Sequence, residues 1–366
     1  MKRTYLAGLA ALAWCAAAAP LIAQEKGGLD QTGPYEPVVG WFKPGIDKWD
    51  RPVASVKFDR PDRIFITTAP ARFTRPNGAM LSADGKVLEE KSQMSTIPPA
   101  QHPHNNIIMV LNGEGKVIEN WAQWDKEITF AHNIAISPYD PERHIWVMDL
   151  GHQILKFTND GKKLVMRLGE KDKPGWDANH FNMPSSLTFL PDGSFLVADG
   201  YVNGRIAKFD KNGKYVSEFG AKGSGPGQFD LVHSVAVDKQ GRVYTADRRN
   251  GRIQVFDANG KFLEEWKNTG SVTRLIITED QHLWMSDATY NRIAKFDLGG
   301  KLLTYWGVTG RNPGEFDNLH NWDVDTSGNL YVADGGNARI QKLVPKKGAD
   351  QARVIGQQFF PPALKN

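Results

Sequence analysis

The sequence predicts an all-β protein, a single six-bladed β-propeller, and two observations support this fold. A unit of about 50 residues recurs, made of an alternating strand, a polar turn, a second strand ending in aspartate, a Gly/Asn turn and further strands. Asp-Gly and Asn-Gly pairs join many of these strands, as in antiparallel hairpins. Four short strands per unit are typical of a propeller blade. The aspartate that closes the second strand recurs at Asp149, Asp199, Asp247, Asp287 and Asp334.

The first blade is the least regular of the six. Its inner strands are predicted at 53–59 and 63–68 and its outer strands at 107–111 and 117–121. A long insertion over 69–106 separates the two pairs. The six blades are expected to begin near residues 53, 131, 184, 232, 271 and 320.

The last blade shows only three clear strands. Either 38–42 or 353–355 is expected to supply the fourth strand and close the ring. Because the repeats leave no room for a second domain, we expect a signal peptide over 1–23, an extension over 24–52 and one propeller over 53–366.

The first residues have the composition of an export signal. Lys2 and Arg3 provide a positive start, 5–19 form a short apolar stretch, and Ala23 offers a cleavage point. The stretch is too short and too rich in alanine for a membrane-spanning helix. Cys15, the only cysteine, lies inside it, so the mature protein would have no disulfide and no thiol ligand. We expect an exported protein, periplasmic or secreted.

The charge balance narrows the range of partners. The chain has 45 basic and 41 acidic residues, a formal net charge of +4, and the basic residues are scattered. This argues against a nucleic-acid partner. We expect a monomer with no membrane partner after signal removal, which binds a small molecule or peptide at one mouth of the central tunnel.

Three histidines occupy the same position in alternate blades. Innermost strands line the tunnel of a propeller, and equivalent positions in every second blade of six are about 120° apart. Three imidazoles at such positions should converge on the axis. The position lies fourteen residues before the closing aspartate, or three more in the second blade because its first hairpin is longer. In blade order it holds Ala54, His132, Ser185, His233, Thr273 and His320.

This pattern predicts a metal site. Three neutral imidazoles with an open fourth position are a usual arrangement of catalytic zinc. We therefore expect His132, His233 and His320 to bind zinc. The alternative is three unrelated tunnel histidines that hydrogen-bond to water.

Strand direction places further candidates beside the histidines. The first strand of a blade begins on the face where the second one ends, so the turn after the second strand shares the face of the histidines. In these turns Tyr201 and Arg248 depart from the repeat and are candidates for function. Arg205 and Arg252 recur with the repeat and are predicted to be struts within the blades. The loops expected on the same face are 69–106, 169–183, 221–231 and 307–319.

Several stretches carry a pattern more specific than the repeat itself. They are NHFNMPSSLTF (179–189), VADGYVNGRIAKFD (197–210), GPGQFDLVHSVAV (225–237), ADRRNGRIQVFD (246–257), MDLGHQILKF (148–157) and FDNLHNWDV (316–324). The repeats resemble the NHL family over about residues 53–345. These stretches are similar to one branch of it, the peptidyl-α-hydroxyglycine α-amidating lyase domain of peptidylglycine amidating enzymes. The similarity is greatest over 131–257.

The resemblance implies a chemistry and a role for each site residue. The activity would be cleavage of the C–N bond of a peptidyl-α-hydroxyglycine, or a related hydroxylated amide, into an amide and glyoxylate. Zinc would be held by His132, His233 and His320. Tyr201 and Arg248 would be the catalytic pair, with Tyr201 as base for the substrate hydroxyl and Arg248 also binding the substrate carboxylate. Zinc suits the stabilisation of an alkoxide, and a guanidinium suits a carboxylate.

The chain departs from the family pattern at three places. Asn318 and Asn321 stand where the family has a methionine two residues before the last histidine and an aspartate directly after it. That aspartate belongs to a structural calcium site, so calcium would lack its carboxylate ligand here. The family's second arginine falls on Ala69, and Arg72 or Arg75 could replace it in substrate binding only through a different loop path.

Two other functions fit a six-bladed propeller. One is a non-catalytic NHL propeller that binds a protein, peptide or glycan, for which a ring of histidines would serve no purpose. The other is a lactonase-like, metal-dependent hydrolase, which would favour oxygen ligands around calcium over imidazoles. The zinc-dependent lyase is the preferred interpretation.

Overall fold

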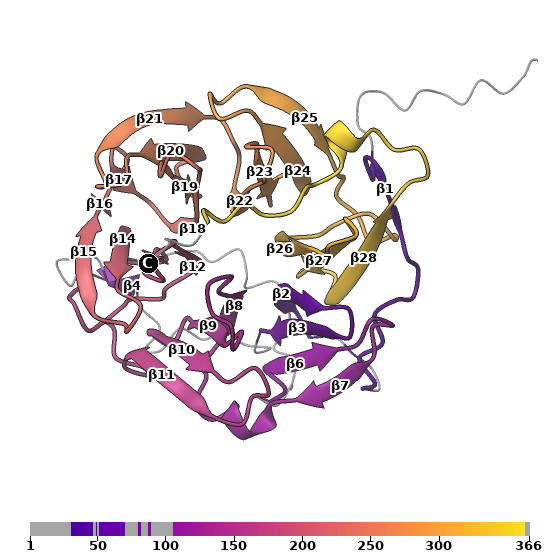
Figure 1. Ribbon diagram of the computed structural model, residues 1–366, viewed down its shortest axis with the longest axis horizontal. Coiled ribbons are helices and arrows are strands. Elements are labelled where there is room, and N and C mark those ends of the chain that lie inside the picture. The colour runs from indigo at the N-terminus through magenta and orange to yellow at the C-terminus, as the bar shows by residue number, and fades with distance from the viewer. Residues whose placement is uncertain are drawn as a thin grey trace, which may run out of the picture.

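The computed structural model confirms the all-β, six-bladed propeller. It describes residues 31–46, 49, 51–69, 80–81, 87–88 and 105–362. Six four-stranded antiparallel sheets stand as blades around a common centre (Figure 1). Within these described ranges, no helix has the length and apolar character needed to cross a membrane. The signal peptide expected over 1–23 lies outside them.

Each blade is a meander whose strands, apart from the last one of the sixth blade, pair in chain order. The blades are β2 (Val53–Arg60), β3 (Arg63–Thr68), β6 (Ile108–Leu111) and β7 (Val117–Asn120); β8 (Ala131–Ile136), β9 (Ile145–Asp149), β10 (Gln153–Phe157) and β11 (Leu164–Gly169); β12 (Ser186–Phe189), β13 (Phe195–Asp199), β14 (Arg205–Phe209) and β15 (Tyr215–Phe219); β18 (Val232–Val237), β19 (Val243–Asp247), β20 (Arg252–Phe256) and β21 (Phe262–Lys267); β22 (Val272–Ile277), β23 (Leu283–Asp287), β24 (Arg292–Phe296) and β25 (Leu302–Trp306); and β26 (Leu319–Val324), β27 (Leu330–Asp334), β28 (Arg339–Pro345) and β1 (Tyr35–Pro37). The small elements are the pairs β4 (Met80–Leu81) with β5 (Val87–Leu88) and β16 (Ala221–Lys222) with β17 (Gln228–Phe229), and the 3-10 helices η2 (Ala122–Trp124) and η3 (Gln351–Arg353).

The sixth blade is completed by β1, which pairs with β28. This corrects the expectation that 38–42 or 353–355 forms the closing strand, because β1 ends just before the first of these segments. It also moves the propeller boundary expected at residue 53, since 35–37 are part of the ring. Burial of Tyr35 explains the choice: its ring packs 5.4 Å from that of Trp306, and its hydroxyl accepts a hydrogen bond from the backbone of Ile355 at 2.9 Å.

Aromatic side chains fill the spaces between blades. Trp284, Trp306 and Trp322 are fully buried and belong to one cluster that joins the fifth and sixth blades. Rings of this size dominate the apolar area that a core removes from water. The tryptophans at strand positions therefore hold neighbouring blades together.

The aspartate that closes each second strand anchors the loop leading into the innermost strand. The carboxylate of Asp247 accepts a hydrogen bond from the backbone N–H of Asp230 at 2.8 Å, and Asp334 accepts one from Asp317 at 2.7 Å. The equivalent bonds run from Thr129 to Asp149, from Asn182 to Asp199 and from Ser271 to Asp287. The repeat thus fixes the backbone just before each residue of the histidine position.

Arg205 and Arg252 are struts. Arg205 Nε donates to Asp199 at 2.9 Å, and Arg252 Nε donates to Asp247 at 2.8 Å. Each guanidinium also donates to loop carbonyls, as Arg252 does to Gly225 at 2.8 Å. These arginines compensate the buried aspartates and tie the loops to the blades.

The chain after β28 runs across the ring. Residues 355–362, here called the C-terminal strap, form the yellow segment that passes over the middle of the ring in Figure 1. The strap is tied to the far ends of innermost strands, because the backbone N–H of Phe359 donates to Ile277 at 2.7 Å. Beyond the second blade's innermost strand, Tyr139 donates to the carbonyl of Pro361. The strap therefore lies on the face opposite the starts of the innermost strands.

Candidate metal centre

His132, His233 and His320 each lie at a β-bulge near the start of an innermost strand. In β18 the ladder passes from Val232 to Ser234, so His233 has no partner across it. The same shift occurs at the other two histidines. A bulge re-aims the side chain of the extra residue. It turns these three imidazoles toward the centre of the ring, where all three are buried.

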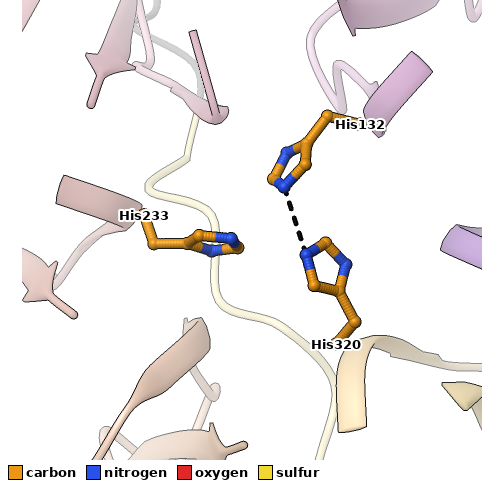
Figure 2. A group of neighbouring side chains, drawn as sticks. All are labelled: His132, His233 and His320. Atoms are coloured by element: carbon orange, nitrogen blue, oxygen red, sulfur yellow. Dashed lines mark hydrogen bonds between the residues drawn. The ribbon is translucent and has the colours of Figure 1, made fainter. Parts of the chain in front are cut away.

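The three rings meet at the axis, as the spacing predicts (Figure 2). One nitrogen of each lies within 4.8 Å of the others. The Nε2 atoms of His132 and His320 are 3.1 Å apart. A tetrahedral zinc ion with nitrogen ligands would separate two such atoms by roughly 3.3 Å. The geometry is therefore that of a three-histidine group able to hold a metal ion.

The other nitrogen of each ring is anchored to the next blade. Nδ1 of each histidine lies at hydrogen-bond distance from a backbone carbonyl, which can only accept. The contacts run from His132 to Ser185 (2.9 Å), from His233 to Thr273 (2.7 Å) and from His320 to Ala54 (2.6 Å). These carbonyls belong to the same position of the following blade. Because Nδ1 must carry the proton, each neutral ring turns an Nε2 lone pair to the centre, as metal-binding histidines do.

The charge state of the rings favours a cation between them. Burial lowers the pKa of His320 to about 4 and that of His132 well below its ordinary value, so both rings are neutral at neutral pH. Two facing lone pairs at 3.1 Å, the contact dashed in Figure 2, then repel each other. A metal ion converts this repulsion into coordination, and three imidazoles are a donor set that suits zinc.

Tyr201 joins the histidines from the turn after β13. Its hydroxyl lies 3.0 Å from Nε2 of His132 and 3.2 Å from Nε2 of His233. The phenol therefore stands beside the point on which the lone pairs converge. The departure from the repeat that made this residue a candidate is explained by this position.

Arg248 lies near the same point, in the turn after β19. Its backbone N–H donates to Leu231 at 3.0 Å, and its Nε donates to the hydroxyl of Ser271 at 2.9 Å. Burial of His233 lowers the pKa of that imidazole, and the positive charge of Arg248 lowers it further. A guanidinium in this turn can bind an anionic group of a ligand held at the histidines.

Arg72 and Arg75 lie outside the described residues. Ala69 is described: its backbone N–H donates to Pro52 at 2.9 Å, and its methyl group packs against the apolar side chains near the histidines.

Apolar side chains, of which only Ala54 was singled out from the sequence, surround the centre. This apolar collar consists of Ala54, Phe130, Leu150, Met183 and Val202. The ring of Phe130 is 5.9 Å from that of His132. Phe130 and Met183 both stand two residues before the histidine position, which is the signal that could have found them. The collar lowers the local dielectric and strengthens electrostatic contacts at the centre.

The described polar side chains next to Asn321 include no carboxylate. Asn321 Nδ2 and the hydroxyl of Ser55 both donate to Asn133 Oδ1 at 3.3 Å. Calcium takes six to eight oxygen ligands and favours carboxylates, whereas these described side chains are neutral and bonded to one another. Asn318 has a structural role of its own, since its φ of 55° is a left-handed conformation that asparagine tolerates.

Comparison with known proteins agrees with the fold and adds a sequence relationship. A family model described as a 6-bladed beta-propeller matches residues 177–292. A probable peptidyl-alpha-hydroxyglycine alpha-amidating lyase of Caenorhabditis elegans is 35% identical over 149 residues, which cover 40% of this chain and 41% of the relative. The chain resembles the amidating lyases. Among the NHL repeat proteins, human NHL repeat-containing protein 3 is 31% identical over 134 residues, 34% of this chain and 38% of that protein.

The sequence similarity covers only part of each of these proteins. The chain matches about two fifths of the length of each of these two relatives. A solved structure of a streptogramin B lyase superimposes with a TM-score of 0.52 over 81% of this chain and 95% of that chain, at 14% identity. Identity at this level shows the shared propeller fold alone.

Proposed function

We propose that this protein is an exported, zinc-dependent lyase that cleaves peptidyl-α-hydroxyglycines, or related hydroxylated amides, into an amide and glyoxylate. The observation that carries the proposal is the group of three buried Nε2 atoms with the Tyr201 hydroxyl at 3.0 and 3.2 Å from two of them. The likeness to amidating lyases supports the substrate class.

The reaction moves one proton and breaks one bond. The substrate hydroxyl loses its proton, its oxygen forms the aldehyde carbonyl of glyoxylate, the C–N bond breaks, and the amide nitrogen takes up a proton. No water is consumed. Zinc held by His132, His233 and His320 would supply Lewis-acid stabilisation of the negative charge on that oxygen. Tyr201, as the base, would accept the hydroxyl proton and return it to the nitrogen.

Arg248 and the collar would complete the site. The guanidinium is suited to bind the substrate carboxylate through paired hydrogen bonds. That contact would turn the hydroxyl toward Tyr201. The apolar collar would exclude water, which keeps the attraction between Arg248 and the carboxylate strong.

Chelation tests the proposed function. Purified mature protein should release glyoxylate from an N-acyl-α-hydroxyglycine, lose this activity after treatment with a chelator, and regain it when zinc is added. Colorimetric detection of glyoxylate measures each state. A folded, zinc-loaded protein that releases none would contradict the lyase assignment and leave a propeller that only binds.

Replacing Tyr201 by phenylalanine should separate catalysis from metal binding. We expect bound zinc to stay at the wild-type level and kcat to fall by roughly 100-fold or more, the usual contribution of a positioned acid or base. Metal analysis and kcat of the same preparation give both values. Tyr290→Phe is the matched control, because that tyrosine is exposed on the fifth blade. Normal turnover in Tyr201→Phe would remove the phenol from the mechanism.

A further inference from the structure

A cavity lies at the end of the innermost strands opposite the metal centre. Ile134 and Ile136, which follow His132 along β8, form part of its wall, as do Gln358 and Phe360 of the C-terminal strap. Its lining also includes two basic side chains from different blades, described below. The cavity is thus separate from the metal centre.

Arg274 is a cation of this cavity without a partner of its own. It directly follows Thr273, at the bulge of β22, and its side chain lines the cavity. The guanidinium makes no hydrogen bond and no ion pair with any residue that the structure describes, and its Nε is buried. Burial lowers the pKa of Arg274 below its ordinary value. A partly buried cation with an unbonded, buried N–H is stabilised by an anion that accepts from it.

The carboxylate whose charge acts on Arg274 is that of Asp323, and it already has two other partners. Asp323 Oδ2 lies 2.9 Å from Nζ of Lys57 and accepts a hydrogen bond from the backbone of Phe58 at 2.8 Å. Lys57 is the second basic residue of the cavity lining. The lining therefore holds two cations and no carboxylate, and Asp323, whose charge acts on Arg274 from outside it, is bonded to Lys57.

We propose that this cavity binds a small monocarboxylate anion through Arg274. A guanidinium presents paired N–H donors in the plane that a carboxylate fills. Lys57 adds a second attraction, and Thr188 and Gln358 offer further donors. The walls formed by isoleucine and phenylalanine side chains leave room only for a small carboxylate, the size of formate or glyoxylate. Glyoxylate as the natural ligand rests on the proposed function, but the site itself does not.

The test measures how added formate changes the Tm of the protein. The protein is first treated with a chelator, so that formate cannot bind to a metal ion. Sodium formate should raise Tm by roughly 2 °C for each tenfold increase in concentration above Kd, whereas sodium chloride at the same ionic strength should not. In Arg274→Met the formate response should disappear. Arg292→Gln is the matched control, since that arginine stacks on Tyr290 and Tyr305 at the rim of the same blade.

Each outcome decides the proposal. Equal shifts with formate and chloride, no shift with formate, or an undiminished formate shift in Arg274→Met would overturn it. Lys57→Gln, which keeps Arg274 in place, should weaken formate binding about tenfold and provides the test if Arg274→Met does not fold. Glyoxylate release is measured separately, so failure of anion binding leaves the lyase assignment standing, and failure of turnover leaves the anion site standing.

Discussion

His233→Ala should lose its metal and its activity while keeping its fold. The substitution removes one of three nitrogen ligands and leaves two, too few for a stable protein site for zinc. Since loss of a residue that merely orients a ligand costs 10–100-fold in affinity, we expect the loss of a ligand to cost more than 100-fold. Metal analysis after dialysis and the glyoxylate assay measure the two effects.

The control for this variant is His180→Ala. His180 pairs with Asp177 on a loop of the same face and lies outside the ring of imidazoles. It should keep wild-type zinc and activity. Circular dichroism should show the same strand content for both variants. If His233→Ala retained its zinc, the three-histidine centre would be wrong.

Arg205→Met should be the most destabilising substitution of a single strut. Arg205 and Asp199 are both fully buried, and burial raises the pKa of Asp199 even beside its partner. Removing the guanidinium leaves that carboxylate with hydrogen bonds from neutral groups only, those of Asn182 and Asn203. The free energy of unfolding should fall by about 3–5 kcal/mol, as expected when one member of a buried ion pair is removed. Chemical denaturation followed by tryptophan fluorescence measures the change.

Two further variants identify the cause of the expected loss. Lys162→Met removes a lysine whose side chain is 83% exposed and pairs with Asp160 at the surface, so stability should not change measurably. Combining Arg205→Met with Asp199→Asn removes both charges and should recover part of the lost stability. A double variant as unstable as Arg205→Met alone would show that lost packing, not the unpaired carboxylate, causes the effect.

The repeat made most of the fold predictable because one residue type performs the same task in every blade. The closing aspartate binds the loop before each innermost strand, so its recurrence reveals the strands and the histidine position together. Tyr201 and Arg248 could be found because they depart from a repeat that the other blades maintain. In the structure both lie near the three histidines.

The features that were missed depend on long-range pairing. The three residues of β1 include a proline and show no alternation, so only pairing with β28 makes them a strand. The bulges at the histidines are a property of two strands in register, which neither strand encodes alone. Arg274 had a local signal, a charged residue in an otherwise apolar strand, but its lack of a partner appears only once the cavity is formed.

The pairing of β1 with β28 also sets the order of folding. About 300 residues of chain separate the two strands, more than in any other pair of strands that the structure describes. Blades one to five can form as they are synthesised, but the circle is completed only when β28 emerges. Until then the first and fifth blades each expose an unprotected flank. With these flanks uncovered, the open ring would be more prone to aggregate than the closed one, which gives the short strand β1 a protective role beyond its three residues.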